Sequence, residues 1–94
     1  MRISEKLKTG LTNAEKIECY KKIIKGYKNR TINTGICGAI NRLFEDCDNY
    51  EYADSSCLFP EFLSKKPIHI TTGYWYSSRQ ERIKVLNELI AELS

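Results

Sequence analysis

Apolar residues recur every three to four positions in the N-terminal third of the chain, which is the spacing of one helix face. Between residues 14 and 27 these positions are Ala14, Ile17, Tyr20, Ile23, Ile24 and Tyr27. Thr12 and Glu15 precede them as a capping box, in which the Thr hydroxyl accepts from a backbone N–H group and the Glu side chain reaches back. The pattern predicts a helix that begins after Thr12 and that Asn29 can close, with Gly26 weakening its end.

A second helix is predicted to begin at Asn33 or Thr34, because either residue is a good N-cap. Apolar positions follow at helical spacing at Ile36, Ala39, Ile40, Leu43 and Phe44. Gly35 and Gly38 leave a strip without side chains on the first turns, which we interpret as close packing of two helices. Approach of the backbone to a ligand is the alternative interpretation.

The C-terminal part carries the best-marked helix, because two capping boxes overlap at its start. Ser77-x-x-Gln80 and Ser78-x-x-Glu81 precede an apolar stripe that consists of Ile83, Leu86, Leu89, Ile90 and Leu93. Upstream, Pro60 divides a shorter helical pattern into two pieces because it lacks an N–H group. The alternation in residues 68–71 favours an extended connector. We therefore predict a mainly α fold for residues 1–94, a small single-domain bundle of three to four helices with one short extended connector.

The apolar content and the cysteines of the chain indicate the cellular compartment that we expect. No apolar run approaches the roughly 18–20 residues that span a bilayer, and residues 1–10 lack the apolar core of a signal peptide. We expect a cytoplasmic protein without a membrane partner, whose four cysteines stay reduced. Cys19 and Cys37 fall within helical patterns and are expected in the core. Because 94 residues bury a modest share of their surface, formation of a homo-oligomer would add burial.

The formal net charge of +3 is unevenly distributed. Residues 1–30 contain nine basic and three acidic side chains, whereas residues 45–54 contain five acidic side chains and no basic one. Such a chain can dock by charge on a partner, but it is a weaker signal for nucleic acid than a uniformly basic domain. The lysines of the first helix are interpreted as a solvated face, with contact to nucleic-acid phosphates as the alternative.

The chain is poor in residues that carry catalysis. His69 is the only histidine, and none of the common hydrolase, metalloprotease or phosphate-loop motifs is present. Cys37, Cys47 and Cys57 are ten residues apart, whereas zinc ligands usually come as close pairs. We therefore expect no enzyme activity, no metal site and no cofactor.

The most informative segment runs from Gly73 to Arg82, where three aromatic residues precede a helix start. A helix N-terminus offers free N–H groups and the positive end of a dipole, which is a ready anion site. Arginine adds forked donors for phosphate, and aromatic rings can stack on a base. The predicted ligand-binding residues are Tyr74, Trp75, Tyr76, Ser77, Ser78, Arg79 and Arg82.

In the alternative interpretation, the residues of this segment stabilise the fold and bind no ligand. In a small domain a Trp is usually a core anchor, so Trp75 would pack against the first helix. Arg82 would then pair with an acid of residues 45–54. These two interpretations differ in whether the aromatic and guanidinium groups face solvent or the bundle interior.

Three motifs resemble a pattern in short uncharacterised proteins of tailed phages, over residues 35–90. They are Gly35-Ile36-Cys37-x-Ala39-Ile40, Leu58-Phe59-Pro60-Glu61 with Lys66-Pro67, and Tyr74-Trp75-Tyr76 followed by Glu81-Arg82-Ile83-x-x-Leu86. The chain departs from the pattern at Ser77, where a proline often follows the aromatic pair. The resemblance implies a phage accessory protein that is expressed in a bacterial host cytoplasm, and it implies no site residues.

These observations favour three functions, in decreasing order of preference. The first is a non-enzymatic binding protein that sequesters a nucleotide or another phosphate-bearing small ligand, in the phage setting to counter host defence. The second is an inhibitor that binds a host defence or regulatory protein through its charge asymmetry. The third is a nucleic-acid-binding protein.

Overall fold

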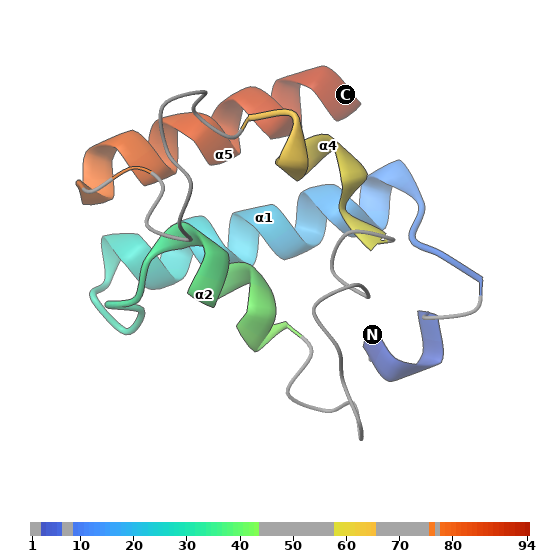
Figure 1. Ribbon diagram of the computed structural model, residues 1–94, viewed down its shortest axis with the longest axis horizontal. Coiled ribbons are helices and arrows are strands. Elements are labelled where there is room, and N and C mark those ends of the chain that lie inside the picture. The colour runs from blue at the N-terminus through green and yellow to red at the C-terminus, as the bar shows by residue number, and fades with distance from the viewer. Residues whose placement is uncertain (1–2, 7–8, 44–57, 66–75, 77) are drawn as a thin grey trace.

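Helices make up most of the chain that the computed structural model describes, which comprises residues 3–6, 9–43, 58–65, 76 and 78–94 (Figure 1). The elements are a 3₁₀-helix η1 (Ile3–Lys6) and the α-helices α1 (Asn13–Lys28), α2 (Ile36–Arg42), α4 (Pro60–Leu63) and α5 (Arg79–Leu93). The prediction of a small, mainly α bundle is confirmed. The extended connector predicted at residues 68–71 lies outside the described residues.

The predicted capping box at the start of α1 is present in full. The Thr12 Oγ1 accepts from the Glu15 backbone N–H at 3.2 Å, and a Glu15 carboxylate oxygen accepts from the Thr12 N–H at 2.9 Å. The same carboxylate pairs with the Lys6 ammonium at 2.8 Å, which ties η1 to α1. At the other end Asn29 is the C-cap residue, as the sequence predicts.

The helices α1 and α5 lie side by side and run in opposite directions (Figure 1). The Asn13 side-chain amide donates to the Leu93 carbonyl at 3.5 Å, so the start of α1 meets the end of α5. The Arg82 guanidinium lies 5.7 Å from the centre of the Tyr27 ring, so the end of α1 meets the start of α5. This arrangement brings the negative end of the α1 dipole close to the positive end of the α5 dipole.

The buried core draws on every α-helix of the described chain. Leu86 and Leu89 of α5 are fully buried, and Tyr20 of α1 contacts Phe59 with ring centres 5.6 Å apart. Cys19 and Cys37 are both buried, which confirms their predicted place in the core. Burial raises the pKa of the Cys19 thiol to about 11, so this group stays protonated and poorly nucleophilic in the folded protein.

The prediction of the N-cap residue of α2 was wrong. The N-cap residue is Gly35, which provides no side-chain cap, rather than Asn33 or Thr34. The Thr34 carbonyl accepts instead from the Tyr27 hydroxyl at 3.0 Å, so the chain at Thr34 is held against α1. Among the described residues, a Cβ atom at Gly35 would meet nothing within 4 Å, and one at Gly38 would lie 3.1 Å from the Thr34 Cβ. The described neighbour of Gly38 is thus the segment before α2, and the predicted close packing of two helices at these glycines stays a prediction.

Gly26, in contrast, is a position that has no room for a side chain. A Cβ atom there would lie 2.4 Å from the Ile32 Cδ1 and 2.6 Å from its Cγ1. The Gly26 carbonyl also accepts from the backbone N–H groups of Thr31 and Ile32 at 3.0 and 3.1 Å. The chain that leaves α1 thus folds back onto Gly26, and this return positions Thr34 and the start of α2.

Pro60 occupies the first turn of α4, where its missing N–H group costs nothing. Leu58 is helical and Phe59 is not, so the chain is interrupted at this point, as the prediction of two short pieces requires. Phe59 and Phe62 are both buried, and they attach α4 to the core.

Candidate functional site

The first turn of α5 is held by a serine cap. Ser78 is the N-cap residue, and its Oγ accepts a hydrogen bond from the Glu81 backbone N–H at 3.1 Å. This half of the predicted Ser78-x-x-Glu81 box is confirmed. Arg79 begins the 15-residue helix with its side chain exposed. The helix dipole and the Arg79 guanidinium therefore place positive potential at the same part of the surface.

The side chain of Arg82, one turn after Arg79, contacts other parts of the fold. Its Nε donates to the Tyr76 carbonyl at 2.7 Å and its Nη1 donates to the Thr34 carbonyl at 3.4 Å. The guanidinium also lies over the Tyr27 ring, a cation–π contact whose ring is itself buried. Arg82 thus joins the segment before α5, the segment before α2 and the end of α1.

Tyr76 has a left-handed backbone, with φ of 58°, two residues before the N-cap residue Ser78 of α5. Its hydroxyl donates to the Lys65 carbonyl just after α4, and its ring packs against the core. Burial, followed by the nearby Glu88 carboxylate, raises the pKa of this phenol. The backbone and the side chain of Tyr76 are therefore both used to fix the start of α5, and its ring is half-buried.

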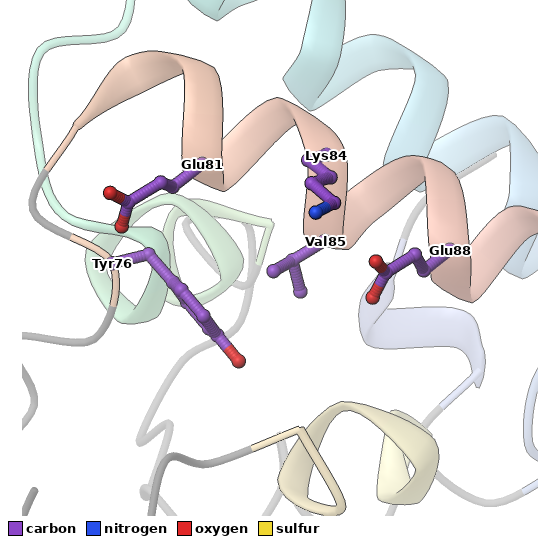
Figure 2. Close-up of a pocket in the computed structure, with 5 residues that line it drawn as sticks. All are labelled: Tyr76, Glu81, Lys84, Val85 and Glu88. Atoms are coloured by element: carbon purple, nitrogen blue, oxygen red, sulfur yellow. The ribbon is translucent and has the colours of Figure 1, made fainter.

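A shallow hollow of about 260 Å³ lies between α5 and Tyr76 (Figure 2). Its lining residues are Tyr76, Glu81, Lys84, Val85 and Glu88. Two carboxylates and one ammonium give this hollow a net negative charge, which disfavours phosphate. The charge of this hollow therefore does not suit an anionic ligand.

More basic side chains lie where α1 ends. Lys28 is the last residue of α1, Arg30 follows its cap, and both side chains are exposed. The contact between Arg82 and Tyr27 places this end of α1 next to the first turn of α5, and Figure 1 shows the two ends on the same side of the molecule. We call the exposed set Lys28, Arg30 and Arg79 the basic end.

The seven predicted site residues fall into three groups according to where the structure places them. Tyr74, Trp75 and Ser77 lie outside the described residues, so their placement stays a prediction. Ser78 and Arg79 are at the helix start, as the sequence predicts. Tyr76 and Arg82 make contacts within the fold, and Arg82 contacts two carbonyls and an aromatic ring.

A polar cluster that the sequence did not indicate lies between α1 and α4. The Tyr20 hydroxyl donates to one Glu61 carboxylate oxygen at 2.6 Å, and the Lys16 ammonium donates to the other at 3.1 Å. Burial and this hydrogen bond raise the pKa of the fully buried Tyr20. The periodicity predicted Tyr20 as a core residue, and its partner 41 residues away carried no local signal.

The described residues contain no group of three or more acidic, Cys or His side chains that could hold a metal ion. No described helix combines the length and the apolar character that crossing a bilayer requires. No family model, curated protein or solved structure matches this chain.

Proposed function

We propose that this protein is a non-enzymatic binding protein that captures a phosphate-bearing small ligand, such as a nucleotide, at the basic end. The observation that carries the proposal is the contact of Arg82 with Tyr27 and with the carbonyls of Thr34 and Tyr76. This contact brings the start of α5 to the end of α1, so exposed cations from two distant parts of the sequence lie at the same end of the molecule.

Each member of the basic end has a distinct task in the proposal. The Arg79 guanidinium supplies forked donors to phosphate oxygens next to the positive end of the α5 dipole. Lys28 and Arg30 neutralise the remaining charge of the ligand. Stacking of a base on Tyr74 or Trp75 is predicted from the sequence alone.

Arg82 acts in this proposal as a positioning residue. Its Nε and Nη1 donate to carbonyls, so its main effect is to hold the helix start in place. Replacing Arg82 with Ala would leave both carbonyls without these donors and would disturb the fold, so a binding test based on this residue alone would be ambiguous.

The test is a thermal-unfolding screen against mono-, di- and cyclic nucleotides. A ligand at 100 times its dissociation constant stabilises the native state by about 2.7 kcal/mol. For a chain of this size, that raises the melting temperature by roughly 10 °C or more. The binding nucleotide is then titrated by calorimetry to obtain its dissociation constant.

Two arginine variants identify the site. Arg79→Ala removes the exposed guanidinium at the helix start, and we expect the affinity to fall about tenfold or more, since charged hydrogen bonds contribute about 1.5–3 kcal/mol. Arg42→Ala removes an exposed arginine from the last turn of α2, and we expect the affinity to be unchanged. A chain that no nucleotide stabilises, or equal losses in both variants, would contradict the proposal and favour docking on a protein partner.

Sequestering a nucleotide signal in an infected bacterium is the setting that the resemblance to phage proteins implies. That setting stays a prediction. Analysis of the small molecules retained by the protein after purification from infected cells would test it.

A further inference from the structure

A second basic surface follows the outer side of α1 and shares only Lys28 with the basic end. Lys21, Lys22, Lys25 and Lys28 are all exposed along the C-terminal half of this helix, and we call them the lysine face. From Lys21 to Lys28 the helix rises about 10 Å. No acidic residue occurs in the sequence between Glu18 and Glu45.

Three other lysines of the described chain, unlike those of the lysine face, form ion pairs. Lys6, Lys16 and Lys65 each lie within 4.0 Å of a carboxylate. Within the part of the chain that the structure describes, none of the four lysines of the face has such a partner. Interaction with the helix dipole stabilises cations in the last turn, which accounts for Lys25 and Lys28 but not for Lys21 and Lys22.

The chemistry of the surrounding surface indicates the class of partner. The other exposed side chains of α1 are Asn13, Ala14 and Glu18, so the helix offers no aromatic ring and no large apolar side chain there. Protein interfaces depend on buried aromatic and apolar anchors and are depleted in lysine. Proteins that bind single-stranded nucleic acid stack bases on aromatic side chains. Neither kind of partner matches a face made of charge alone.

A duplex phosphate backbone does match such a face. Duplex DNA carries one negative charge per roughly 1.7 Å of its axis, so about six phosphates lie along 10 Å. Lysine acts on phosphate as a point charge, without the planar geometry that base recognition requires. We propose that the lysine face of α1 binds the phosphate backbone of duplex DNA without reading its sequence.

The test measures how binding depends on salt. Binding to a fluorescein-labelled 20-base-pair DNA duplex is followed by fluorescence anisotropy from 20 to 200 mM KCl. If four lysines contact phosphates, the slope of log K against log salt concentration is about −3.6, which is a loss of about 4,000-fold over this range. The sequence of the duplex should have no effect.

Matched variants locate the contact and leave Lys28 in place, because it also belongs to the basic end. Lys21→Gln with Lys25→Gln removes two contacts, so the slope should fall to about −1.8. Lys84→Gln removes an exposed lysine from α5, between Glu81 and Glu88, and the slope should stay unchanged. Circular dichroism checks that both proteins remain folded, since all the replaced side chains are exposed.

Several results would overturn the proposal. They are no binding at 20 mM KCl, an unchanged slope in the double variant, or an equal loss in Lys84→Gln. Tighter binding of the corresponding single strand would indicate an aromatic platform elsewhere in the chain. Equally tight binding of polyglutamate would show that the face selects any polyanion, such as an acidic protein. All of these outcomes are independent of whether a nucleotide stabilises the protein at the basic end.

Discussion

Gly26 shows how a single missing methyl group shapes the turn after α1. A Cβ atom at this position would lie 2.4 Å from the Ile32 Cδ1. The β-branched Ile32 side chain is stiff, and its backbone N–H is bonded to the Gly26 carbonyl at 3.1 Å, so it has little room to move. Overpacking of this kind costs about 1–3 kcal/mol, whereas Ala in place of Gly gains about 1 kcal/mol in helix propensity. We expect Gly26→Ala to lower the free energy of unfolding by about 1 kcal/mol in urea denaturation.

The same substitution should change sign when Ile32 is shortened. In an Ile32→Ala background the two clashing carbon atoms are absent, so Gly26→Ala keeps only its propensity gain and should stabilise the protein by up to about 1 kcal/mol. A loss of equal size in both backgrounds would mean that the Gly26 conformation, and not the contact with Ile32, requires glycine.

The start of α1 depends on a carboxylate with a strongly lowered pKa. Hydrogen bonding from the Lys6 ammonium, followed by hydrogen bonding from the Thr12 backbone N–H, lowers the pKa of Glu15 from 4.5 to about 2. The ionised form is favoured in the folded state, so its stabilising contribution is fully present above pH 4.5. This contribution is lost as the pH falls from there towards 2.

We therefore expect Glu15→Gln to flatten the acid dependence of stability. Between pH 5 and 2, the melting temperature of the variant should fall less than that of the wild type, because the glutamine side chain does not titrate. Glu18→Gln, on the exposed face of the same helix, is the matched control and should keep the wild-type profile. If wild type and Glu15→Gln decline in parallel, the hydrogen bonds to Lys6 and Thr12 do not persist in solution.

Helix ends with a local signal could be predicted from sequence, and those set by distant contacts could not. The caps at Thr12 and Ser78 involve partners three residues away, so the sequence contains the whole interaction. The start of α2 was misplaced because the Thr34 carbonyl is held by Tyr27 and by Arg82, and Arg82 lies 48 residues away. Val85 is buried although it was left out of the predicted stripe, since α5 buries a wider face than the periodicity suggests.

The candidate site was predictable in part for the same reason. The sequence placed Ser78 and Arg79 at a helix start, because capping is local. It did not predict that Arg82 joins three segments, or that the end of α1 lies next to the start of α5. Those facts depend on the antiparallel packing of α1 and α5, which is set by the shared core and by contacts such as that between Asn13 and Leu93, 80 residues apart.

Cooperative opening of the whole bundle can be tested through two buried thiols. Cys19 of α1 and Cys37 of α2 face the same core from different helices. If the described chain unfolds as the single unit that the sequence predicts, both thiols become reactive in the same opening event. We expect a Cys47→Ser, Cys57→Ser variant to react with a thiol reagent slowly, and the two remaining cysteines to react at similar rates.

The dependence of these rates on urea distinguishes global opening from local opening. When reclosing is fast, the labelling rate follows the equilibrium population of the open state. The free energy from labelling should then equal the free energy of global unfolding, with the same urea dependence, at both cysteines. Faster labelling of Cys37 with a shallow urea dependence would show that α2 detaches alone. The contacts of Thr34 with Tyr27 and Arg82 would then be too weak to hold the start of α2 against the pair formed by α1 and α5.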